Sequence, residues 1–439
     1  MEIEEIGSRV LEKVKPTEEK KKRVREISEE ILEEVRSNLK MENEPEIVGS
    51  VSKDTYINDP DIDVFVKFPL STSRDSMERK IIETGRTILE SSKERYAEHP
   101  YIYGHYKGFE VDIVPCYEME DISKMKSAVD RTPFHTEYIK ENLREEQKDE
   151  ARLLKAYLEG IGAYGAKAEV WGFSGYLCEL LILQYGSFKK TIENVSGWKP
   201  GQTIEIEETD KDFDDPLVVI DPIDPDRNVA SPVSKEKFSL FVLSSKLFLD
   251  DPNLKFFFPD EVRTLEKEKL SKMIEERGTS LLGLKFPKPD VVEDNLYPQV
   301  QKCLRRLVHH LSHRDFEPLH SGYFVKDDRL LLIFEFKSDI LPDVEKHRGP
   351  PVWVEHTQDF IKKYREDVYL EEDRLWVDRY RKYTSVKESI MNIMEEIGLG
   401  SDLNKFLPEK VTFLDQEKIL KSEKKALTEF YDRRFPWER

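Results

Sequence analysis

The sequence predicts an α+β fold that is divided among several domains. At 439 residues the chain is too long for a single hydrophobic core, and roughly two to four domains are expected. Segments with helical spacing of apolar residues are interspersed with short segments of strand character. Two of these strands, residues 101–106 and 109–114, are separated only by Lys107-Gly108, a favourable turn for a β-hairpin.

The bulk composition is that of a protein with a large solvent-facing surface. Charged residues make up 36% of the chain, and no apolar run reaches the roughly 18 residues that a membrane helix needs. The N-terminus is acidic and unlike a secretory signal. Cys116, Cys178 and Cys303 lie far apart and are interpreted as buried thiols. We therefore expect a cytoplasmic protein with no membrane partner.

The net charge of −19 counts against a general binder of polyanions. Nucleic-acid binders are usually basic on the face that binds. The basic residues of this chain do cluster, so contact with a nucleic acid would depend on local patches and on shape.

The N-terminal part predicts a helix, a short strand, a turn and a second strand. Residues 17–39 have apolar side chains at three- and four-residue spacing, which is typical of an amphipathic helix. Residues 47–48 form a short strand that ends at Gly49-Ser50. Asp59-Pro60 then turns the chain into a strand that starts at Asp61, and residues 75–91 have helical periodicity.

Carboxylates are concentrated at the start of this second strand. Asp61 and Asp63 point to the same side because strand side chains alternate between faces. A neighbouring strand carries Glu110 and Asp112 on one face. Asp112 lies deeper in the apolar run and costs more to bury without a partner, so we favour it over Glu110, which is interpreted as a structural residue in a salt bridge. A cluster of three carboxylates predicts a divalent metal site used in two-metal phosphoryl or nucleotidyl transfer.

The turn before the strand has features of a phosphate-binding loop. Gly49 lets the backbone approach a phosphate closely, and backbone N–H groups with the Ser50 hydroxyl can hold it. Lys53 is placed to add positive charge.

The middle of the chain is predicted to be mostly helical. Residues 127–135 are expected to form a polar loop that contains His135. A helix over 146–159 carries Lys155, and Tyr164 follows in a glycine-rich turn. Residues 177–185 form a continuously apolar helix. A strand over 217–220 leads into the rigid turn 221–228, whose prolines and spacing argue against an EF-hand calcium site; it presents one arginine, Arg227.

The last third is predicted to mix helices and strands. Helices are expected over 265–277, 299–313, 386–397 and 418–430, and strands over 279–286 and 330–336. The helix 299–313 carries a basic face that suits RNA phosphates, with Lys302, Arg305 and Arg306. Zinc binding by His309 and His313 is the alternative, but Cys303 falls off that face.

Residues 374–383 interleave basic and aromatic side chains, a pattern that suits phosphate contact and base stacking. A half-buried strand with a charged outer face explains the pattern almost as well. The candidate RNA contacts here are Arg379, Arg381 and Lys382.

The motifs together resemble a known family. Gly-Ser, Asp-x-Asp and a later strand aspartate define the nucleotidyltransferase superfamily that includes DNA polymerase beta. Longer segments closely resemble the archaeal-type, class I CCA-adding enzymes. These segments are residues 95–101 (RYAEHPY), 111–117 (VDIVPCY), 127–135 (SAVDRTPFH), 172–180 (GFSGYLCEL) and 294–299 (DNLYPQ).

The resemblance implies a head, neck, body and tail. The head is a polymerase-beta-like nucleotidyltransferase domain, the neck is helical, and the body and tail are α+β domains. The expected boundaries are 1–145 for the head, 146–215 for the neck, 216–260 with 381–439 for the body, and 261–380 for a tail that grips tRNA. A homodimer is compatible with the family.

The resemblance also implies the chemistry, which is template-independent addition of C, C and A to a tRNA 3′ end from CTP and ATP. Asp61, Asp63 and Asp112 match the carboxylates that bind two Mg²⁺ ions. One ion, held by all three, would lower the pKa of the tRNA 3′-OH, and the other would neutralise the leaving pyrophosphate. The residues that match nucleotide-binding positions are Gly49, Ser50, Lys53, His135, Lys155, Tyr164 and Arg227, the last of which helps to read the base.

Two alternatives share these features. Another polymerase-beta-like terminal nucleotidyltransferase, of the poly(A) polymerase or oligoadenylate synthetase type, would have the same carboxylates. A non-catalytic tRNA-binding protein is the other class, and the presence of all three aspartates argues against it.

Overall fold

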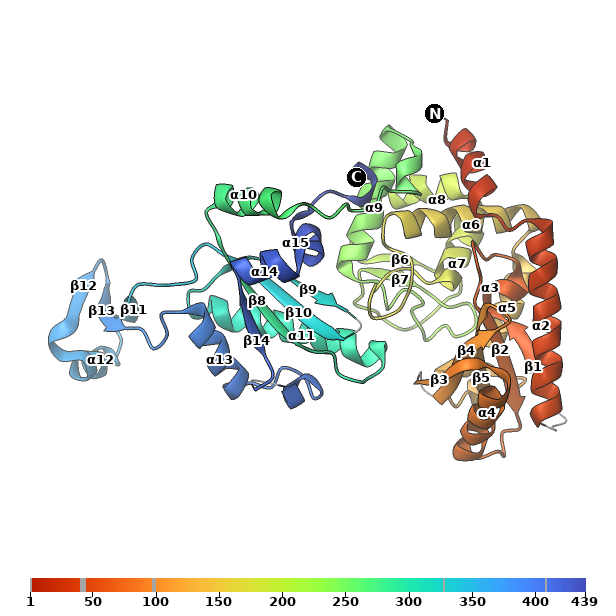
Figure 1. Ribbon diagram of the computed structural model, residues 1–439, viewed down its shortest axis with the longest axis horizontal. Helices are drawn as coiled ribbons and strands as arrows, with labels where there is room; N and C mark the ends of the chain where they lie inside the picture. The colour runs from red at the N-terminus through yellow and green to blue at the C-terminus, as the bar shows by residue number, and fades with distance from the viewer. Residues whose placement is uncertain (1, 40–44, 97–99, 327, 407–408) are drawn as a thin grey trace. The chain divides into compact units, whose positions relative to one another are not determined.

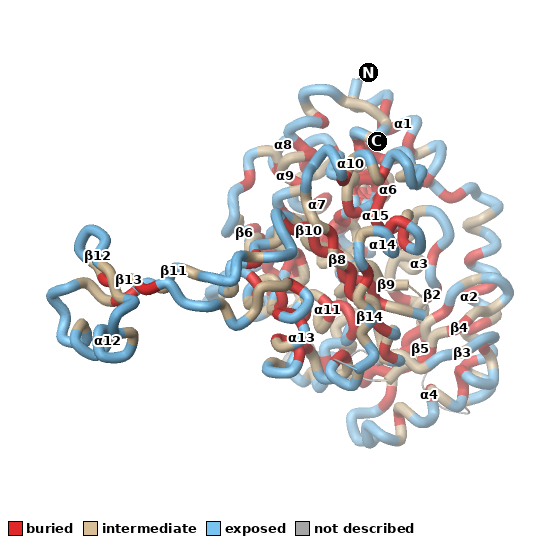
Figure 2. The backbone as a smooth tube through the Cα atoms, turned by 60° about the vertical axis from the view of Figure 1, so that its left-hand side comes forward, coloured by how far each residue is buried: buried red, intermediate tan, exposed pale blue. Residues whose placement is uncertain are grey.

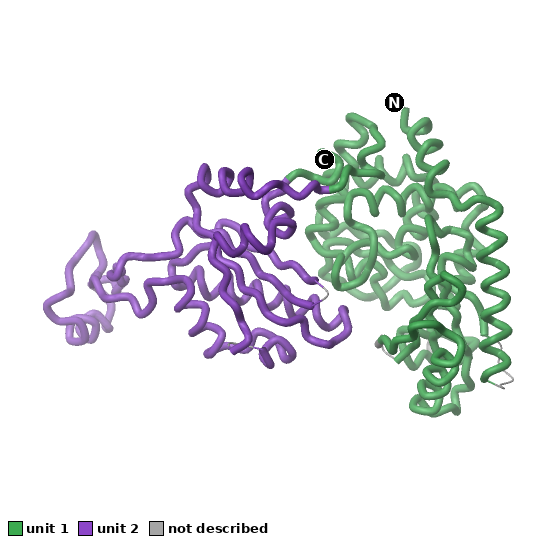
Figure 3. Tube along the Cα trace, in the orientation of Figure 1, with its two compact units in different colours: residues 1–261, 434–439 green, residues 262–433 purple. Residues whose placement is uncertain are grey.

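The computed structural model describes the chain apart from residues 1, 40–44, 97–99, 327 and 407–408. It divides into two compact units (Figure 3). Unit 1 contains residues 1–261 and 434–439, and unit 2 contains residues 262–433. Residues 216–260, which were expected to share a body domain with 381–439, lie in unit 1, whereas 381–433 lie in unit 2.

The first part of unit 1 is a five-stranded sheet in the order β1-β2-β5-β4-β3 (Figure 1). Its strands are β1 (Pro45–Val48), β2 (Ile62–Phe68), β3 (Glu90–Tyr96), β4 (Pro100–Tyr106) and β5 (Phe109–Tyr117). The pair β2 and β5 is parallel, whereas β1 with β2, β3 with β4 and β4 with β5 are antiparallel. The hairpin expected at Lys107-Gly108 is confirmed as the β4–β5 turn.

Two helices cover one face of this sheet, and shorter helices lie on the other. Helices α2 (Glu18–Leu39) and α4 (Arg74–Ile88) pack Ile27, Ile31, Met77 and Ile81 against alternate residues of β2 and β5. Helices α3 (Gly49–Lys53) and α5 (Thr132–Asn142) lie beyond the opposite face. Alternation along the strands therefore directs Ile62 and Val64 into the core, and Asp63 away from α2 and α4.

Residues 127–135 were expected to form a loop, and the structure instead contains a 3₁₀ turn, η2 (Ala128–Arg131), and the first turn of α5. The buried Asp130 carboxylate accepts the backbone N–H of Ser127 at 2.8 Å and of Tyr117 at 2.9 Å, which fixes the turn. Pro133 in the first turn favours a helix start. His135 therefore lies on a helix.

The second part of unit 1 is mainly helical. Its helices are α1 (Ile3–Val14), α6 (Glu145–Gly160), α7 (Gly175–Tyr185), α8 (Phe188–Val195) and α9 (Lys235–Asp250), with a parallel pair of short strands, β6 (Gln202–Ile204) and β7 (Leu217–Val219). One core cluster joins all of these elements. It also contains Trp437 from η6 (Pro436–Glu438), whose ring stacks on Phe256 of η3 (Leu254–Phe256) with centroids 5.0 Å apart.

Unit 2 is built on a four-stranded sheet in the order β14-β8-β10-β9. The strands are β8 (Ser280–Pro287), β9 (Pro318–Val325), β10 (Arg329–Phe336) and β14 (Thr412–Asp415), and all neighbours are antiparallel. Helices α11 (Glu293–Ser312) and α13 (Val386–Glu396) cover one face, and α10 (Lys267–Arg277), α14 (Gln416–Ser422) and α15 (Lys424–Tyr431) cover the other. The central strand β10 is buried from Leu330 onward, as Figure 2 shows.

Two helices of unit 2 differ from the expected ranges. α11 begins six residues before Gln299, because its apolar stripe already includes Leu296 and its first turn carries acidic residues. The single helix expected over 418–430 is broken into α14 and α15 at Glu423, whose backbone is not helical. The Glu423 carboxylate is buried and binds Lys326 at 2.9 Å.

Residues 344–380 of unit 2 form a separate three-stranded sheet in the order β11-β13-β12. Its elements are β11 (Val344–Pro351), α12 (Thr357–Tyr364), β12 (Val368–Glu371) and β13 (Arg374–Tyr380). No helix among the described residues is long and apolar enough to cross a bilayer. Cys116, Cys178 and Cys303 are buried free thiols, as predicted.

Candidate active site

Two of the three predicted metal ligands are paired across adjacent strands. Asp63 of β2 is the register partner of Asp112 of β5, and the parallel pairing places their side chains on one face of the sheet. Asp61 lies one residue before β2, on the same side as Asp63 by alternation. The sheet thus brings the three carboxylates into one neighbourhood.

These carboxylates are held in an environment that disfavours negative charge. Burial, together with Asp112 and Asp61, raises the pKa of Asp63 to about 7. Burial raises the pKa of Asp112 to about 6, with Arg95 opposing the effect. The Oδ1 atom of Asp112 is buried and has no hydrogen-bond partner. Within the described ranges, no three His, Cys, Asp or Glu side chains meet at metal-ligand spacing, so the aspartates are neighbours that do not converge on one point.

Gly49 lies against this carboxylate pair. Its φ of +69° is in the left-handed region, and a Cβ built on it would lie 2.4 Å from Asp63 Oδ2. A side chain at position 49 would therefore be strained and would also displace the Asp63 carboxylate. The Gly49 N–H donates to Thr136 Oγ1 of α5 at 3.2 Å, and Ser50 follows in the first turn of α3.

Lys53 and Lys155, both expected at nucleotide-binding positions, meet at one buried carboxylate. Lys53 Nζ lies 2.5 Å from Glu179 Oε2, and Lys155 Nζ lies 2.8 Å from Glu179 Oε1. The Thr55 hydroxyl also donates to Glu179, at 2.5 Å. Burial acts to raise the pKa of Glu179, but Lys155 and Lys53 outweigh it and lower that pKa to about 2. Glu179, on α7, is therefore an ionised residue that fixes both lysines.

Tyr164 lies beside this lysine pair. Its backbone pairs with Phe173. A Cβ built on Gly175 would lie 3.1 Å from the Tyr164 hydroxyl and 3.7 Å from Lys155 Nζ. Both polar groups thus approach the first turn of α7.

His135 and Arg227 meet at a second buried carboxylate, that of Asp221. His135 Nε2 lies 2.8 Å from Asp221 Oδ2, and Arg227 donates to the same oxygen at 2.7 Å. The His135 ring stacks on Tyr176 with centroids 4.1 Å apart. Burial acts to raise the pKa of Asp221, but His135 and Arg227 lower it to about 2. Arg227, which was expected to help read the base, and His135, which was expected to contact the nucleotide, are therefore held together.

Arg95 and Lys167 are near the aspartates and were not predicted. Both favour the ionised forms of Asp61 and Asp112. The Arg95 guanidinium lies 3.6 Å from the centroid of the Tyr103 ring, and Tyr103 hydrogen-bonds Glu110. Residues 97–99 of the family-like segment 95–101 lie outside the described residues.

The six candidate RNA contacts of unit 2 differ in how accessible they are. Lys302 and Arg305 are exposed on α11, and Lys382 is exposed after β13. Arg306 donates to the Gly398 carbonyl.

The remaining two candidates are engaged in internal ion pairs, and Lys382 also lies 3.9 Å from Glu396. Arg379 binds Glu345 at 2.5 Å, and Arg381 binds Asp315 at 2.5 Å and Glu345 at 3.0 Å. On α11, His309 and His313 have ring centroids 4.4 Å apart, but no third ligand joins them among the described residues.

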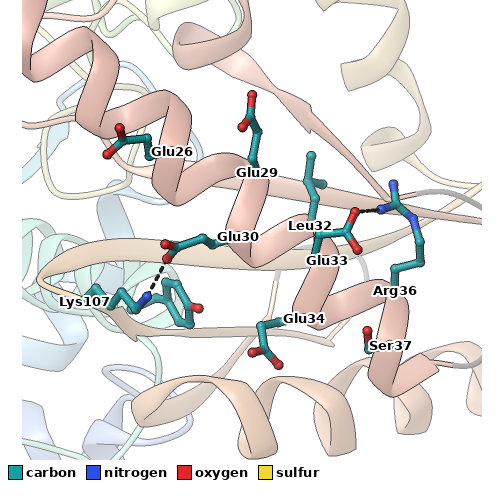
Figure 4. A pocket seen from close by; sticks show the side chains of 10 residues that line it. Glu26, Glu29, Glu30, Leu32, Glu33, Glu34, Arg36, Ser37 and Lys107 are labelled. Atoms are coloured by element: carbon teal, nitrogen blue, oxygen red, sulfur yellow. Dashed lines mark hydrogen bonds and ion pairs between the residues drawn. The ribbon is translucent and has the colours of Figure 1, made fainter.

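A pocket of about 830 Å³ lies elsewhere on unit 1, over α2 and the β4–β5 turn (Figure 4). Glutamates line it, among them Glu26, Glu29, Glu30 and Glu33, and Glu30 pairs with Lys107 at 2.5 Å. None of the residues of the candidate active site lines this pocket.

Three family models match successive parts of the chain. They are "Nucleotidyltransferase domain" at residues 28–143, "tRNA nucleotidyltransferase, second domain" at 149–258 and "CCA-adding enzyme, C-terminal domain" at 277–415. The CCA-adding enzyme of Methanosarcina mazei is 39% identical over 417 residues, which cover 92% of this chain and 91% of that protein.

The chain belongs to the CCA-adding enzyme family.

A second family member, the CCA-adding enzyme of Archaeoglobus fulgidus, is 36% identical and covers 96% of this chain and 97% of its own length. Among solved structures, mtPAP in complex with GTP matches with a TM-score of 0.45 at 12% identity. The match covers 58% of this chain and 72% of the mtPAP chain.

Glu179 and Asp221 are the main site residues that sequence reasoning missed. Glu179 is the acidic residue inside the apolar helix α7, and a charge in such a helix is a signal that it has a buried partner. Asp221 was considered only as a member of an acidic turn. Its contacts with α5 and α7 depend on the tertiary fold and left no local signal.

Proposed function

We propose that this chain adds C, C and A to the 3′ end of tRNA from CTP and ATP, without a nucleic-acid template and with release of pyrophosphate. The observation that carries the proposal is the match to CCA-adding enzymes over 92% of the chain. A catalytic domain alone would fit any nucleotidyltransferase. The match of residues 277–415 to the C-terminal domain of CCA-adding enzymes favours this one activity.

The cofactor proposed is Mg²⁺, bound as two ions by Asp61, Asp63 and Asp112. Nucleotidyltransferases generally use divalent metal ions. The donor set fits such an ion, because carboxylate oxygens are hard ligands and Asp112 Oδ1 is buried without a partner. When bound, the metal would lower the pKa of the attacking hydroxyl and offset charge on the leaving pyrophosphate. Burial, and then repulsion from Asp112 and Asp61, raise the pKa of Asp63, and a bound cation would relieve that repulsion.

The protein's own groups would orient the nucleotide for in-line attack of the tRNA 3′-oxygen on the α-phosphorus. Lys53 and Lys155 share one carboxylate, so two ammonium groups minus one carboxylate leave one net positive charge for the triphosphate. Gly49 gives the phosphates close access to the backbone, and the Ser50 hydroxyl and Tyr164 would contact the nucleotide. His135 and Arg227 would face the base.

The remaining proposals concern partners and organisation. tRNA is the proposed partner, with the nucleotidyltransferase head at 1–145 and RNA contacts from Lys302, Arg305, Arg306, Arg379, Arg381 and Lys382. A homodimer in the cytoplasm and the division into head, neck, body and tail are part of the same proposal.

One assay tests the function. The protein is incubated with Mg²⁺, tRNA lacking its terminal CCA, and each nucleoside triphosphate singly and then in pairs. Growth by C that stops, followed by one A, supports CCA addition. A long A tail would instead indicate a poly(A) polymerase or a related terminal transferase, and tRNA binding without incorporation would indicate a non-catalytic protein.

A further inference from the structure

Asp221 is buried at the start of a closed turn. It follows β7 and has no exposed surface. The backbones of Ile220 and Asn228 pair across the base of the turn, and the Asn228 side chain binds Asp215 and the Leu217 carbonyl, each at 2.9 Å. The turn is therefore a rigid frame for the residues between its ends.

Four donors converge on the Asp221 carboxylate, and they use both oxygens. Oδ2 accepts from Arg227 at 2.7 Å and contacts His135 Nε2 at 2.8 Å. Oδ1 accepts from the Tyr176 hydroxyl at 3.2 Å and from the Ile223 N–H at 3.1 Å. The donors come from α5, from α7 and from the turn itself, so one carboxylate ties three elements together.

This arrangement fixes the direction of the Arg227 guanidinium and leaves most of its N–H donors unused by Asp221. Its NH1 group is bound to Asp221, and 30% of the side chain is exposed. A guanidinium has five N–H donors in a planar fork, so the bonds not used by Asp221 keep a defined direction. His135 is oriented in the same way, because its ring is bound at Nε2 and stacked on Tyr176.

Asp221 is not needed merely to fasten the turn to the head. Arg131 of η2 already binds Asp224 of the same turn at 2.9 Å. Burying a carboxylate completely has a desolvation cost that can exceed the gain from its ion pairs, so stability alone does not explain this second tie. Two of its partners, His135 and Arg227, are among the residues that the family resemblance assigns to the nucleotide.

We propose that Asp221 is the positioning residue that sets nucleotide choice, by holding Arg227 and His135 in the orientation that reads the incoming base. The proposal rests on the proposed function. It predicts that selectivity for CTP and ATP over UTP and GTP depends on the charge of a residue that does not itself touch the nucleotide.

The test compares Asp221→Asn with Asp224→Asn. Asp224 is the matched control, because it lies in the same turn and pairs with Arg131 rather than with Arg227. For each variant, kcat/KM is measured for CTP against UTP on tRNA lacking CCA, and for ATP against GTP on tRNA ending in CC. Asp221→Asn should lower these ratios by about tenfold or more, because a misdirected Arg227 guanidinium no longer binds the correct base better than the wrong one. Asp224→Asn should leave them within about twofold.

A double-mutant cycle separates positioning from a purely structural role. Because Asp221 is proposed to act through Arg227 and His135, Asp221→Asn should change selectivity less in an Arg227→Ala background than in the wild type. Tyr176→Phe, which removes one hydroxyl bond, should lower selectivity to a smaller degree, and it serves as the milder variant if Asp221→Asn fails to fold.

Two results would overturn the inference. One is wild-type selectivity in a folded Asp221→Asn variant or, if that variant does not fold, in Tyr176→Phe. The other is a loss of selectivity in Asp224→Asn equal to that in Asp221→Asn. Failure of the proposed function looks different, because the wild-type protein itself would then add no C or A to tRNA.

Discussion

Asp63 of β2 and Asp112 of β5 are direct register partners in a parallel strand pairing. Both are partly buried, and the pKa of each is raised above its usual value. Like charges held together in this way cost stability, and such costs concentrate at functional sites.

Asp112→Asn should abolish the addition of both C and A, by about a thousandfold or more, because a metal site contributes several kcal/mol to transfer. It should also melt at a higher temperature at pH 8. The pKa of Asp112 is about 6 in the folded state and 3.8 ordinarily. Between pH 3.8 and pH 6 the folded protein therefore binds a proton that the unfolded chain releases, and the wild type loses stability as the pH rises through this range. The gain should vanish near pH 4, where the carboxyl is protonated anyway.

Calorimetry at both pH values, activity assays and a tRNA gel shift check this prediction. Wild-type activity would contradict the role of Asp112, and so would a loss of tRNA binding equal to the loss of activity.

Glu179→Gln should destabilise the protein by about 3–5 kcal/mol, because it leaves two buried ammonium groups without their counter-charge. Lys155, whose pKa burial already lowers, would be driven to release its proton. The KM for both nucleotides should rise. The exposed Glu145, paired with Lys148 at 2.6 Å, provides the control, and Glu145→Gln should cost at most about 1 kcal/mol.

The contribution of the Glu179 carboxylate to the free energy of unfolding depends on pH in the opposite direction to that of Asp112. Glu179 has a folded-state pKa of about 2 and a usual value of 4.5. Its stabilising effect is fully present above pH 4.5 and is lost as pH falls toward 2. The stability difference between the wild type and Glu179→Gln should therefore shrink in acid. A difference that stays constant from pH 6 to pH 3 would contradict the ionised pair.

Gly49→Ala should be inactive, because its Cβ would lie 2.4 Å from Asp63 Oδ2 and its φ is +69°. Gly108→Ala is the control. It has a φ of +88° but an added Cβ would meet nothing within 4 Å, so it should lose only about 1 kcal/mol of stability and keep activity. Equal activity loss in both variants would show that backbone strain, and not displacement of Asp63, is responsible.

Charge reversal of Lys302 and Arg305 should weaken tRNA binding and lower its salt dependence, because both side chains are exposed on α11. Arg381→Ala should instead reduce the stability of unit 2, since Arg381 binds Asp315 and Glu345. Fluorescence titration at several salt concentrations separates the two effects. Unchanged affinity in the reversed variant would remove α11 from the RNA interface.

Local patterns predicted α2 and β2 well, whereas the helix expected over 75–91 ends at Ile88 and residues 90–91 belong to β3. The alternation in residues 61–66 and the apolar spacing in 17–39 depend only on nearby residues, and β2 and α2 follow them closely. The helix start expected at residue 299 was wrong, because Leu296 extends the buried stripe and Pro298 lies inside α11, which begins at residue 293.

The contacts within the candidate site could not be predicted in the same way. Lys53 and Lys155 were identified from family motifs, but the carboxylate between them comes from a third element, α7. Pairings of this kind depend on tertiary burial, which single-sequence spacing does not encode.

The stacking of Trp437 on Phe256 has a consequence for synthesis of the chain. Residues 434–439 belong to unit 1, yet the ribosome makes them after all 172 residues from 262 to 433 of unit 2. The core of unit 1 therefore lacks Trp437 while unit 2 is synthesised and folds. A nascent chain halted within unit 2 would lack Trp437, so the side of the Phe256 ring that stacks on Trp437 would be uncovered in the unit that carries the aspartates.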